Sequence, residues 1–331
     1  MKIIKLIFVL LFFFSINNTL FADEFQNWLK SFKKIALEKG ISEQTFISAM
    51  NNVKYLPKVI EYDRYQPEFY EDTKTYISKR TSVDKLTQGK MIYKNNILLI
   101  NKVEKEFDVE KELLLALMGI ETNFGKYLGK MDILSSLATL SFDKRRSGFF
   151  TKELINILQL IDRGIVDYNV LYGSWAGAFG NFQFMPSTIM NHAIDYNLDK
   201  KIDLKAIDDS FASAANYINK MGWKQNKPCY LEIDLTENVP AYLLNTSAKK
   251  IKNKKKIRKI KKYIKNFDKI TINEDLIVGI ITPDRDIVEN SKLLEPAYLV
   301  FRNYELILKW NRSLRFGLAV CNLKNKFKNE L

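Results

Sequence analysis

Histidine and cysteine are scarce in this chain of 331 residues, which holds one histidine, His192, and two cysteines, Cys229 and Cys321. A zinc site of the usual cysteine and histidine type therefore has too few ligands. A nucleophile activated by histidine would have to use His192, which lies in the ordinary helical context MNHAIDY. We interpret His192 as a structural histidine at the surface or half buried. Acid–base chemistry in this chain must therefore rest mainly on carboxylates.

The two cysteines are too few for a disulfide scaffold. They lie far apart in the sequence and could pair in an oxidising compartment. The sequence alone favours two unpaired thiols over a bond.

The N-terminal apolar run is too short to span a bilayer. Lys2 and Lys5 flank the start of this run, which extends over residues 6–14 and is followed by polar residues and Ala22. This layout predicts a secretory signal peptide over residues 1–22, cleaved after Ala22. No cysteine lies nearby, which argues against a lipid anchor. We therefore expect a soluble, monomeric protein exported to the periplasm.

Positive charge dominates, with a formal net charge of +14. Such a charge suits an anionic partner: nucleic acid, a membrane surface or a polyanionic cell wall. Export makes the last two the better candidates. The basic stretch 249–265 carries Ile257, Ile260 and Ile264 at helical spacing, so it could bind anionic lipid or wall, although a solvated charged face is the common interpretation.

Helical periodicity covers most of the chain up to residue 223. Ser42 is placed to cap a helix after a turn at Gly40, and residues 57–75, with two prolines and many aromatics, predict an extended connector. From Pro228 to about residue 300 apolar and polar residues alternate, which is typical of strands. A last helical segment closes the chain, so the fold class is mainly α with a β-rich insertion.

The segment ELLLALMGIETNFGK, residues 112–126, contains an apolar run that ends in Glu121. A run that is apolar on every side predicts a helix buried in a core, with Gly125 as its left-handed cap. Burial of Glu121 without a partner would raise its pKa, which suits a general acid. The alternative is a helix-end glutamate that reaches water and pairs with Lys126.

Two further segments could contact a ligand. GSWAGAFG, residues 173–180, predicts a tight turn where backbone approaches either a ligand or another helix. Arg145 and Arg146 precede Phe149 and Phe150, an arrangement that suits carboxylate or sugar recognition but also fits the solvated start of a basic helix.

A calcium-like loop begins at Asp195. Its oxygen ligands at the expected spacing are Asp195, Asn197, Asp199 and Asp203. Lys200 stands where the turn glycine belongs, and Ala206 stands where a bidentate acid should close the site. We therefore predict a loop without metal, and no cofactor.

Taken together, these segments resemble the lytic murein transglycosylase B family of exported enzymes that cleave peptidoglycan glycan strands. The matching segments are GIETNFG, ILSSLATLSFDKRR, GSWAGAFGNFQFMPST, ANYINKMGW and WNRS, with GIS at Gly40 and DRYQPEF at Asp63. The resemblance implies a lysozyme-like helical core with a helical accessory lobe and an inserted small β-rich lobe. The implied divisions are a signal peptide at 1–22, an accessory region at 23–105, the catalytic core at 106–227, the β-rich insertion at 228–303 and a C-terminal helix at 304–331 that completes the core.

The resemblance also implies that Glu121 is the catalytic acid. The substrate-binding positions that it implies are Tyr76, Arg145, Arg146, Ser174, Gln183, Thr188, Tyr217 and Asn311. The chain departs from the family where Phe149, Phe316 and Trp310 replace tyrosines and where Asn181 and Phe182 replace a Tyr–Gly pair.

The implied reaction cleaves the β-1,4 bond between N-acetylmuramic acid and N-acetylglucosamine. One glutamate would act first as acid and then as base, leaving a 1,6-anhydromuramic end. The alternatives are a lysozyme-type hydrolase, in which water captures C1, and a non-catalytic wall-binding protein.

Overall fold

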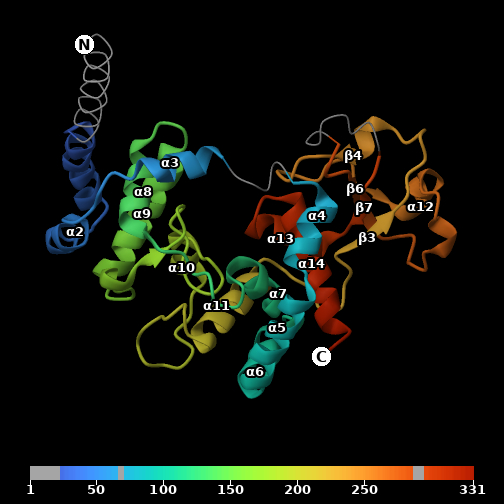
Figure 1. The fold of residues 1–331 in the computed structure, drawn as a ribbon, viewed down its shortest axis with the longest axis horizontal. Helices are drawn as coiled ribbons and strands as arrows, with labels where there is room; N and C mark the ends of the chain where they lie inside the picture. Colours follow the sequence, from blue (N-terminus) through green and yellow to red (C-terminus); the bar gives the residue numbers. More distant parts are fainter. Residues whose placement is uncertain (1–22, 66–70, 286–293) are drawn as a thin grey trace, which may run out of the picture. The chain divides into compact units, whose positions relative to one another are not determined.

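A computed structural model describes residues 23–65, 71–285 and 294–331 (Figure 1). These residues are mostly helical, with a small two-stranded sheet and a five-stranded sheet, which confirms the predicted fold class. In the described part of the chain no helix is both long and apolar enough to cross a membrane. The predicted signal peptide, 1–22, lies outside the described residues.

The chain forms two compact units built from alternating segments. The described residues of Met1–Tyr65, Leu128–Asn191 and Leu198–Asp203 make unit 1, and those of Gln66–Tyr127, His192–Asn197 and Leu204–Leu331 make unit 2. The domain boundaries expected from the resemblance, at residues 105, 227 and 303, stay predictions.

Unit 1 is a group of helices with one short sheet. Its elements are a helix over residues 23–38, α2 Glu43–Met50, α3 Pro57–Arg64, β1 Met131–Asp132, α8 Ile133–Phe142, α9 Ser147–Asp162, η2 Tyr168–Val170, β2 Tyr172–Gly173 and α10 Pro186–His192, which ends at the boundary with unit 2. α8 and α9 lie side by side (Figure 1), and β1 pairs antiparallel with β2. Ser42 caps α2 as predicted, its side chain accepting from the backbone N–H of Thr45 at 3.2 Å.

Helix α3 corrects the prediction of an extended connector over residues 57–75. Pro57 is the first residue of this helix, where its missing N–H costs no hydrogen bond and its fixed φ suits the first turn. The proline therefore starts a helix instead of breaking one. Residues 66–70 of the predicted connector lie outside the described residues.

Polar residues on the buried helix α8 hold the segment before α3. Ser135 accepts from the backbone N–H of Lys54, and Thr139 from that of Leu56, each at 3.0 Å. Both side chains are buried, so these bonds satisfy hydroxyls that would otherwise cost free energy in the core. These bonds account for two of the small polar residues within ILSSLATLSF, Ser135 and Thr139.

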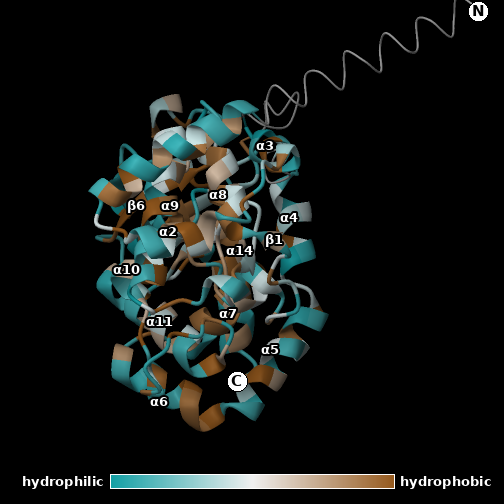
Figure 2. Cartoon of the chain, turned by 90° about the vertical axis from the view of Figure 1, so that its left-hand side faces the viewer, coloured by the Kyte–Doolittle hydropathy of each residue, from teal (hydrophilic) through white to brown (hydrophobic). Residues whose placement is uncertain are grey.

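Unit 2 contains the other helices and the larger sheet. Its helices are α4 Thr73–Arg80, α5 Val83–Asn95, α6 Ile97–Phe107, α7 Lys111–Thr122, α11 Ile207–Lys220, α13 Arg302–Trp310 and α14 Leu314–Lys328. α7 packs against α14, α5 and α6. Figure 2 shows hydrophilic and hydrophobic segments in turn along α5 and α6, as expected for helices that cover a core on one face.

The five-stranded sheet lies in the predicted β-rich insertion. Its strands are β3 Tyr230–Ile233, β4 Leu244–Asn245, β5 Lys255–Lys256, β6 Ile277–Ile281 and β7 Ala297–Val300, in the order β3-β7-β6-β4 with β5 beside β6. β7 pairs antiparallel with β3 and β6, opposing Tyr298 to Glu232 and Leu299 to Ile280. Every residue of β7 is buried, so the protein covers this central strand on both faces of the sheet.

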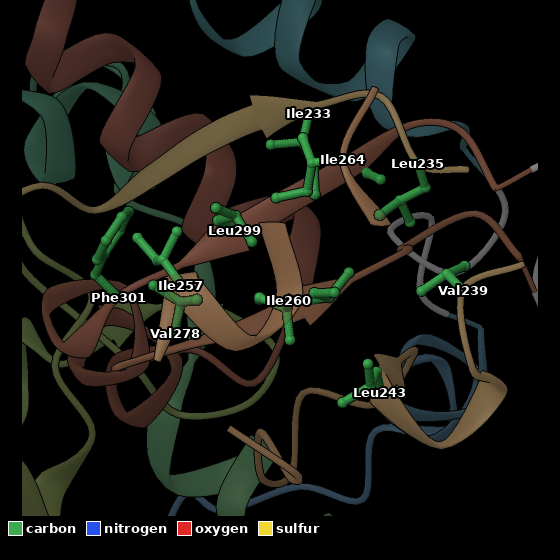
Figure 3. Packing of buried hydrophobic residues seen from close by; sticks show 12 residues of the cluster. Ile233, Leu235, Val239, Leu243, Ile257, Ile260, Ile264, Val278, Leu299 and Phe301 are labelled. Carbon is green, nitrogen blue, oxygen red and sulfur yellow. The ribbon is translucent and has the colours of Figure 1, made fainter. Parts of the chain in front are cut away.

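The basic stretch 249–265 packs its apolar residues into this insertion. It contains α12 Ile257–Ile260 and η4 Lys261–Tyr263, which precede η5 Phe267–Lys269; η3 Ala241–Leu243 lies upstream of the stretch. Ile257, Ile260 and Ile264 belong to the hydrophobic cluster over the sheet (Figure 3). The stretch therefore has no free apolar face with which to enter a bilayer, and the residues that it exposes are mostly lysines.

The predicted pair of unpaired thiols is wrong: Cys229 and Cys321 form a disulfide across a sequence separation of 92. Both are buried, and they join the segment before β3 to α14. Pairing of β3 with β7 and packing of α14 in unit 2 bring the two sulfurs together. Residue spacing carries no information on such a long-range approach.

Candidate active site

Helix α7 is buried almost along its whole length, as its apolar run predicts. Leu113 to Gly119 are all buried. At its start, the carboxylate of Glu110 binds the indole N–H of Trp223, the backbone N–H of Asn226 at 2.9 Å and the ammonium of Lys324 at 3.2 Å. These bonds compensate the burial of a charged side chain and anchor the helix where it begins.

The cap of α7 differs from the prediction by two residues. The helix ends at Thr122, and Asn123 is its left-handed cap, with φ 51°. Asparagine adopts this conformation more readily than most residues, so a glycine is not needed at this position. Gly125 also has positive φ, 81°, but lies beyond the cap.

A half-buried lysine binds the end of the same helix. Lys85 of α5 donates to the backbone carbonyl of Gly119 and to Asn123 Oδ1, the latter at 2.9 Å. Its ammonium complements the negative end of the helix dipole. Burial, and then the charge of Arg80, lower the pKa of Lys85.

Glu121 projects from the last turn of α7 and is half buried. Trp310, the last residue of α13, donates its indole N–H to Glu121 Oε1 at 2.9 Å. The expectation of a carboxyl group at the end of a buried helix holds, and the structure adds a hydrogen-bond donor that sequence reasoning had treated only as a lost tyrosine.

Three rings lie in a row next to this carboxyl group. The Trp310 ring lies 5.3 Å from that of Tyr217, which stacks on His192 at 4.5 Å. Burial raises the pKa of the Tyr217 hydroxyl. Burial, and then the charge of Lys220, lower the pKa of His192. Both rings therefore remain uncharged near neutral pH, and His192 is half buried as its context predicts.

Tyr76 and Asn311 complete the predicted residues of unit 2. Tyr76 on α4 is buried, with the guanidinium of Arg80 3.5 Å from its ring centroid. Asn311 caps α13 directly after Trp310, and its backbone N–H donates to Ile307 at 3.0 Å. Asn311 is thus one residue from a side chain that contacts Glu121.

In unit 1, Arg145 and Arg146 share one carboxylate. Asp63 of α3, which is 2% exposed, binds Arg145 Nη1 at 2.9 Å and also Arg146 Nη2. The Arg146 guanidinium lies 4.7 Å from the ring centroid of Phe150. Asp63 offsets one of the two positive charges and holds both side chains, which remain partly exposed. The segment DRYQPEF contained this residue, but its spacing gave no sign of the partners.

The other predicted residues of unit 1 lie in or beside the glycine-rich segment. Ser174 Oγ accepts from the N–H of Ala178 at 3.0 Å. The side-chain amide of Gln183 donates to the carbonyls of Leu128 at 3.3 Å and Gly180 at 3.1 Å. Both side chains thus stabilise the turn, and each keeps polar atoms that could meet a ligand. Thr188 is half buried in α10.

Close packing explains a glycine of this turn. Gly177 has φ 88°, and a Cβ there would lie 2.5 Å from Leu137 Cδ2 on α8. Of the two interpretations of GSWAGAFG, approach to another helix therefore accounts for Gly177.

The calcium-like loop keeps part of its turn geometry. Lys200 has φ 72°, a value that suits the glycine of a calcium loop better than lysine. Across the described ranges no group of three or more histidine, cysteine, aspartate or glutamate side chains is placed to hold a metal ion. The metal-free loop stays a prediction.

Within unit 2 the structure thus brings both Glu121 and Tyr217 into contact with Trp310. Within unit 1 it joins Arg145 to Arg146 through Asp63. The sequence matches the model of a protein family described as "Transglycosylase SLT domain" over residues 24–325. The chain belongs to this family.

The chain is also similar to a named bacterial protein. It is 35% identical over 149 residues to the membrane-bound lytic murein transglycosylase B of Escherichia coli K12, a match that covers 45% of this chain and 41% of the relative. The chain thus matches less than half the length of that relative.

Solved structures match over more of the chain. SltB3 from Pseudomonas aeruginosa, in complex with NAG-NAM-pentapeptide, superposes with a TM-score of 0.80 at 29% identity, covering 92% of this chain and 79% of that one. Slt35 from Escherichia coli, in complex with bulgecin A, superposes at 0.75 and 23% identity, covering 93% of each chain, and supports the fold alone. The lysozyme-like helical fold is thereby confirmed.

Proposed function

We propose that this SLT transglycosylase is a lytic enzyme that cleaves the β-1,4 bond between N-acetylmuramic acid and N-acetylglucosamine in peptidoglycan. The observation that carries the proposal is Glu121, a half-buried carboxyl group at the end of the buried helix α7 with an indole donor on one oxygen. A binding protein would have no use for an acid so placed. The ligand named for SltB3, NAG-NAM-pentapeptide, supports the substrate class.

In the proposed reaction Glu121 starts protonated. It gives its proton to the glycosidic oxygen, whose bond to C1 breaks with the electron pair leaving on that oxygen. The N-acetyl group of the substrate stabilises the positive charge at C1. Glu121, now ionised, takes the proton from the C6 hydroxyl as its oxygen bonds to C1. The glutamate is regenerated, no water is consumed, and a 1,6-anhydromuramic end remains.

Eight other residues are proposed to bind the glycan strand. They are Tyr76, Arg145, Arg146, Ser174, Gln183, Thr188, Tyr217 and Asn311. The arginine pair held by Asp63 offers its exposed faces to anionic groups of the substrate. The proposal includes no cofactor and no metal, and a monomer suffices.

The test is mass spectrometry of the soluble products released from purified sacculi by the mature protein. The proposal predicts muropeptides lighter by one water than those released by a lysozyme. The variant Glu121→Gln keeps the shape of the side chain but cannot supply the proton, so release should fall below detection. A matched control is Glu112→Gln on the same helix, whose carboxylate pairs with Lys111, and it should cleave as the wild type does.

Other outcomes decide between the alternatives. Reducing-end products would mean that water captures C1, as in a lysozyme-type hydrolase. Binding without release by folded wild-type protein would favour a wall-binding scaffold. Cleavage by a folded Glu121→Gln variant would disprove the role of Glu121.

We also propose that the protein acts in the periplasm. The N-terminal layout predicts a signal peptide, and the disulfide between Cys229 and Cys321 suits an oxidising compartment. Fractionation of cells, with the thiols alkylated before and after reduction, tests the location and the disulfide together.

The basic stretch 249–265 is proposed to hold the enzyme on the anionic wall or membrane surface through electrostatic attraction alone. Its isoleucines are buried in the hydrophobic cluster and cannot insert into a membrane. Nucleic acid is not expected as a partner of an exported protein. Glutamine at the exposed lysines should weaken binding to sacculi at low salt and leave the wild type and variant equal at high salt. Equal binding at low salt would contradict the proposal.

A further inference from the structure

Trp310 holds one oxygen of Glu121 from a second element. Its indole N–H donates to Glu121 Oε1 at 2.9 Å, and the two residues lie in the last turns of different helices, α13 and α7. Each helix is packed in the core of unit 2: α7 is buried along its length, and α13 buries Leu306 and Ile307. The contact therefore joins two side chains whose backbones are fixed.

The orientation of the indole ring is set by its neighbour. Tyr217, from α11, lies 5.3 Å from the Trp310 ring at an interplanar angle of 31°. Tyr217 in turn stacks on His192 at 4.5 Å. Rotation of the indole away from Glu121 would break this ring contact as well as the hydrogen bond.

Indole nitrogen is a donor and never an acceptor. In a protonated carboxyl group the carbonyl-type oxygen is the better acceptor, while the other oxygen carries the proton. An N–H directed at Oε1 therefore keeps Oε1 in the carbonyl state and leaves the acidic proton on Oε2. The same N–H stabilises Glu121 after ionisation, because hydrogen bonds to charged groups are stronger than bonds between neutral groups.

We propose that Trp310 is a positioning residue that assigns the proton of Glu121 to Oε2, so that Oε2 both delivers the proton to the glycosidic oxygen and receives it from the C6 hydroxyl. This inference rests on the proposed function and adds the identity of the transferring oxygen. Oε1 remains bound to the indole through both halves of the reaction, and no atom beyond those of the proposed reaction is needed.

The test removes the N–H and keeps the ring. L-3-Benzothienylalanine, which has sulfur in place of the indole N–H, is introduced at position 310 by codon suppression. With soluble uncrosslinked glycan strands as substrate, kcat should fall about tenfold to a hundredfold with KM unchanged, because the hydrogen bond to Glu121 is lost while the ring contacts are kept. Unchanged kcat, or an effect confined to KM as expected of a sugar-binding ring, would overturn the inference.

A second readout does not depend on turnover. The chain has four tryptophans, and Trp310→Phe assigns the indole N–H resonance of Trp310 by its disappearance. That resonance should shift upfield in Glu121→Ala, which removes the acceptor, and stay in place in Glu112→Ala. A resonance unmoved by Glu121→Ala would overturn the inference even if the benzothienyl variant misfolds. If the wild-type protein releases no anhydro products, both the proposed function and this inference are overturned. If the wild type is active and the benzothienyl variant is equally active, only this inference is overturned.

Discussion

At the scale of single residues, two buried carboxylates of this protein are bound by several hydrogen-bond donors or cations. Glu110, at the start of α7, is buried among three donors, and Asp63 is buried beneath two arginines. His192 has no such partner: its Nδ1 is buried without a hydrogen bond among the described residues, and Lys220 adds a positive charge nearby. Neutral imidazole is the form that such a site accepts, since burial penalises the charged form.

His192 should therefore titrate below its ordinary value of 6.5 in the folded protein. Because the unfolded chain binds the proton more readily, this histidine makes stability fall as pH drops through 6.5 toward the folded pKa, and the loss is complete below it. As the chain has one histidine, its ring C2 proton gives an unambiguous NMR titration. Lys220→Gln should raise the measured pKa, whereas a folded-state pKa at or above 6.5 would contradict the assignment.

At the scale of elements, the proposed catalytic acid and its hydrogen-bond donor both lie in the last turns of helices. α7 presents Glu121 in its last turn, α13 ends at Trp310, and the cap of α7 is an asparagine held by a lysine from α5. The lysine binds both the cap side chain and the carbonyl of Gly119. Positive charge at this end stabilises the helix dipole and fixes the turn that bears the proposed acid.

Lys85→Met should lower the free energy of unfolding by about 1–3 kcal/mol, because it leaves a carbonyl and an amide oxygen without their donor. It should also lower the proposed cleavage rate without raising KM, since the turn bearing Glu121 loosens. Urea unfolding and kinetics on glycan strands measure the two effects. The control is Lys90→Met on the same helix, whose ion pair with Glu330 is more exposed and should contribute less than about 1 kcal/mol. Equal losses in the two variants would contradict the role of Lys85.

At the scale of the whole molecule, a strongly basic chain is closed by one disulfide in its described residues. The bond between Cys229 and Cys321 encloses every strand of the five-stranded sheet and the basic stretch 249–265. In that stretch some cations pair with acids, as Lys254 does with Glu305 at 2.8 Å and Arg258 with Asp275 at 2.9 Å. The positive charge of this stretch therefore lies on the surface of a packed part of the fold and not on a free tail.

Replacing both cysteines by alanine should lower the free energy of unfolding by about 2–5 kcal/mol, because the unfolded chain regains the freedom of a long loop. Denaturant unfolding of wild type with and without reductant gives the same comparison without mutation. In the double variant reductant should have no further effect. If reduction leaves the wild-type midpoint unchanged, the two cysteines do not form the bond in solution.

The sequence by itself determined those features that depend on near neighbours. The buried helix that carries Glu121 in its last turn follows from an apolar run of residues. The cap at Ser42 follows from a serine placed after a turn, and the strands after Pro228 follow from the alternation of apolar and polar residues. Only the tertiary structure decided the disulfide, the sharing of Asp63 by two arginines and the bond from Trp310 to Glu121. These contacts join residues distant along the chain, and the packing of whole helices and strands, which no local spacing encodes, brings them within reach.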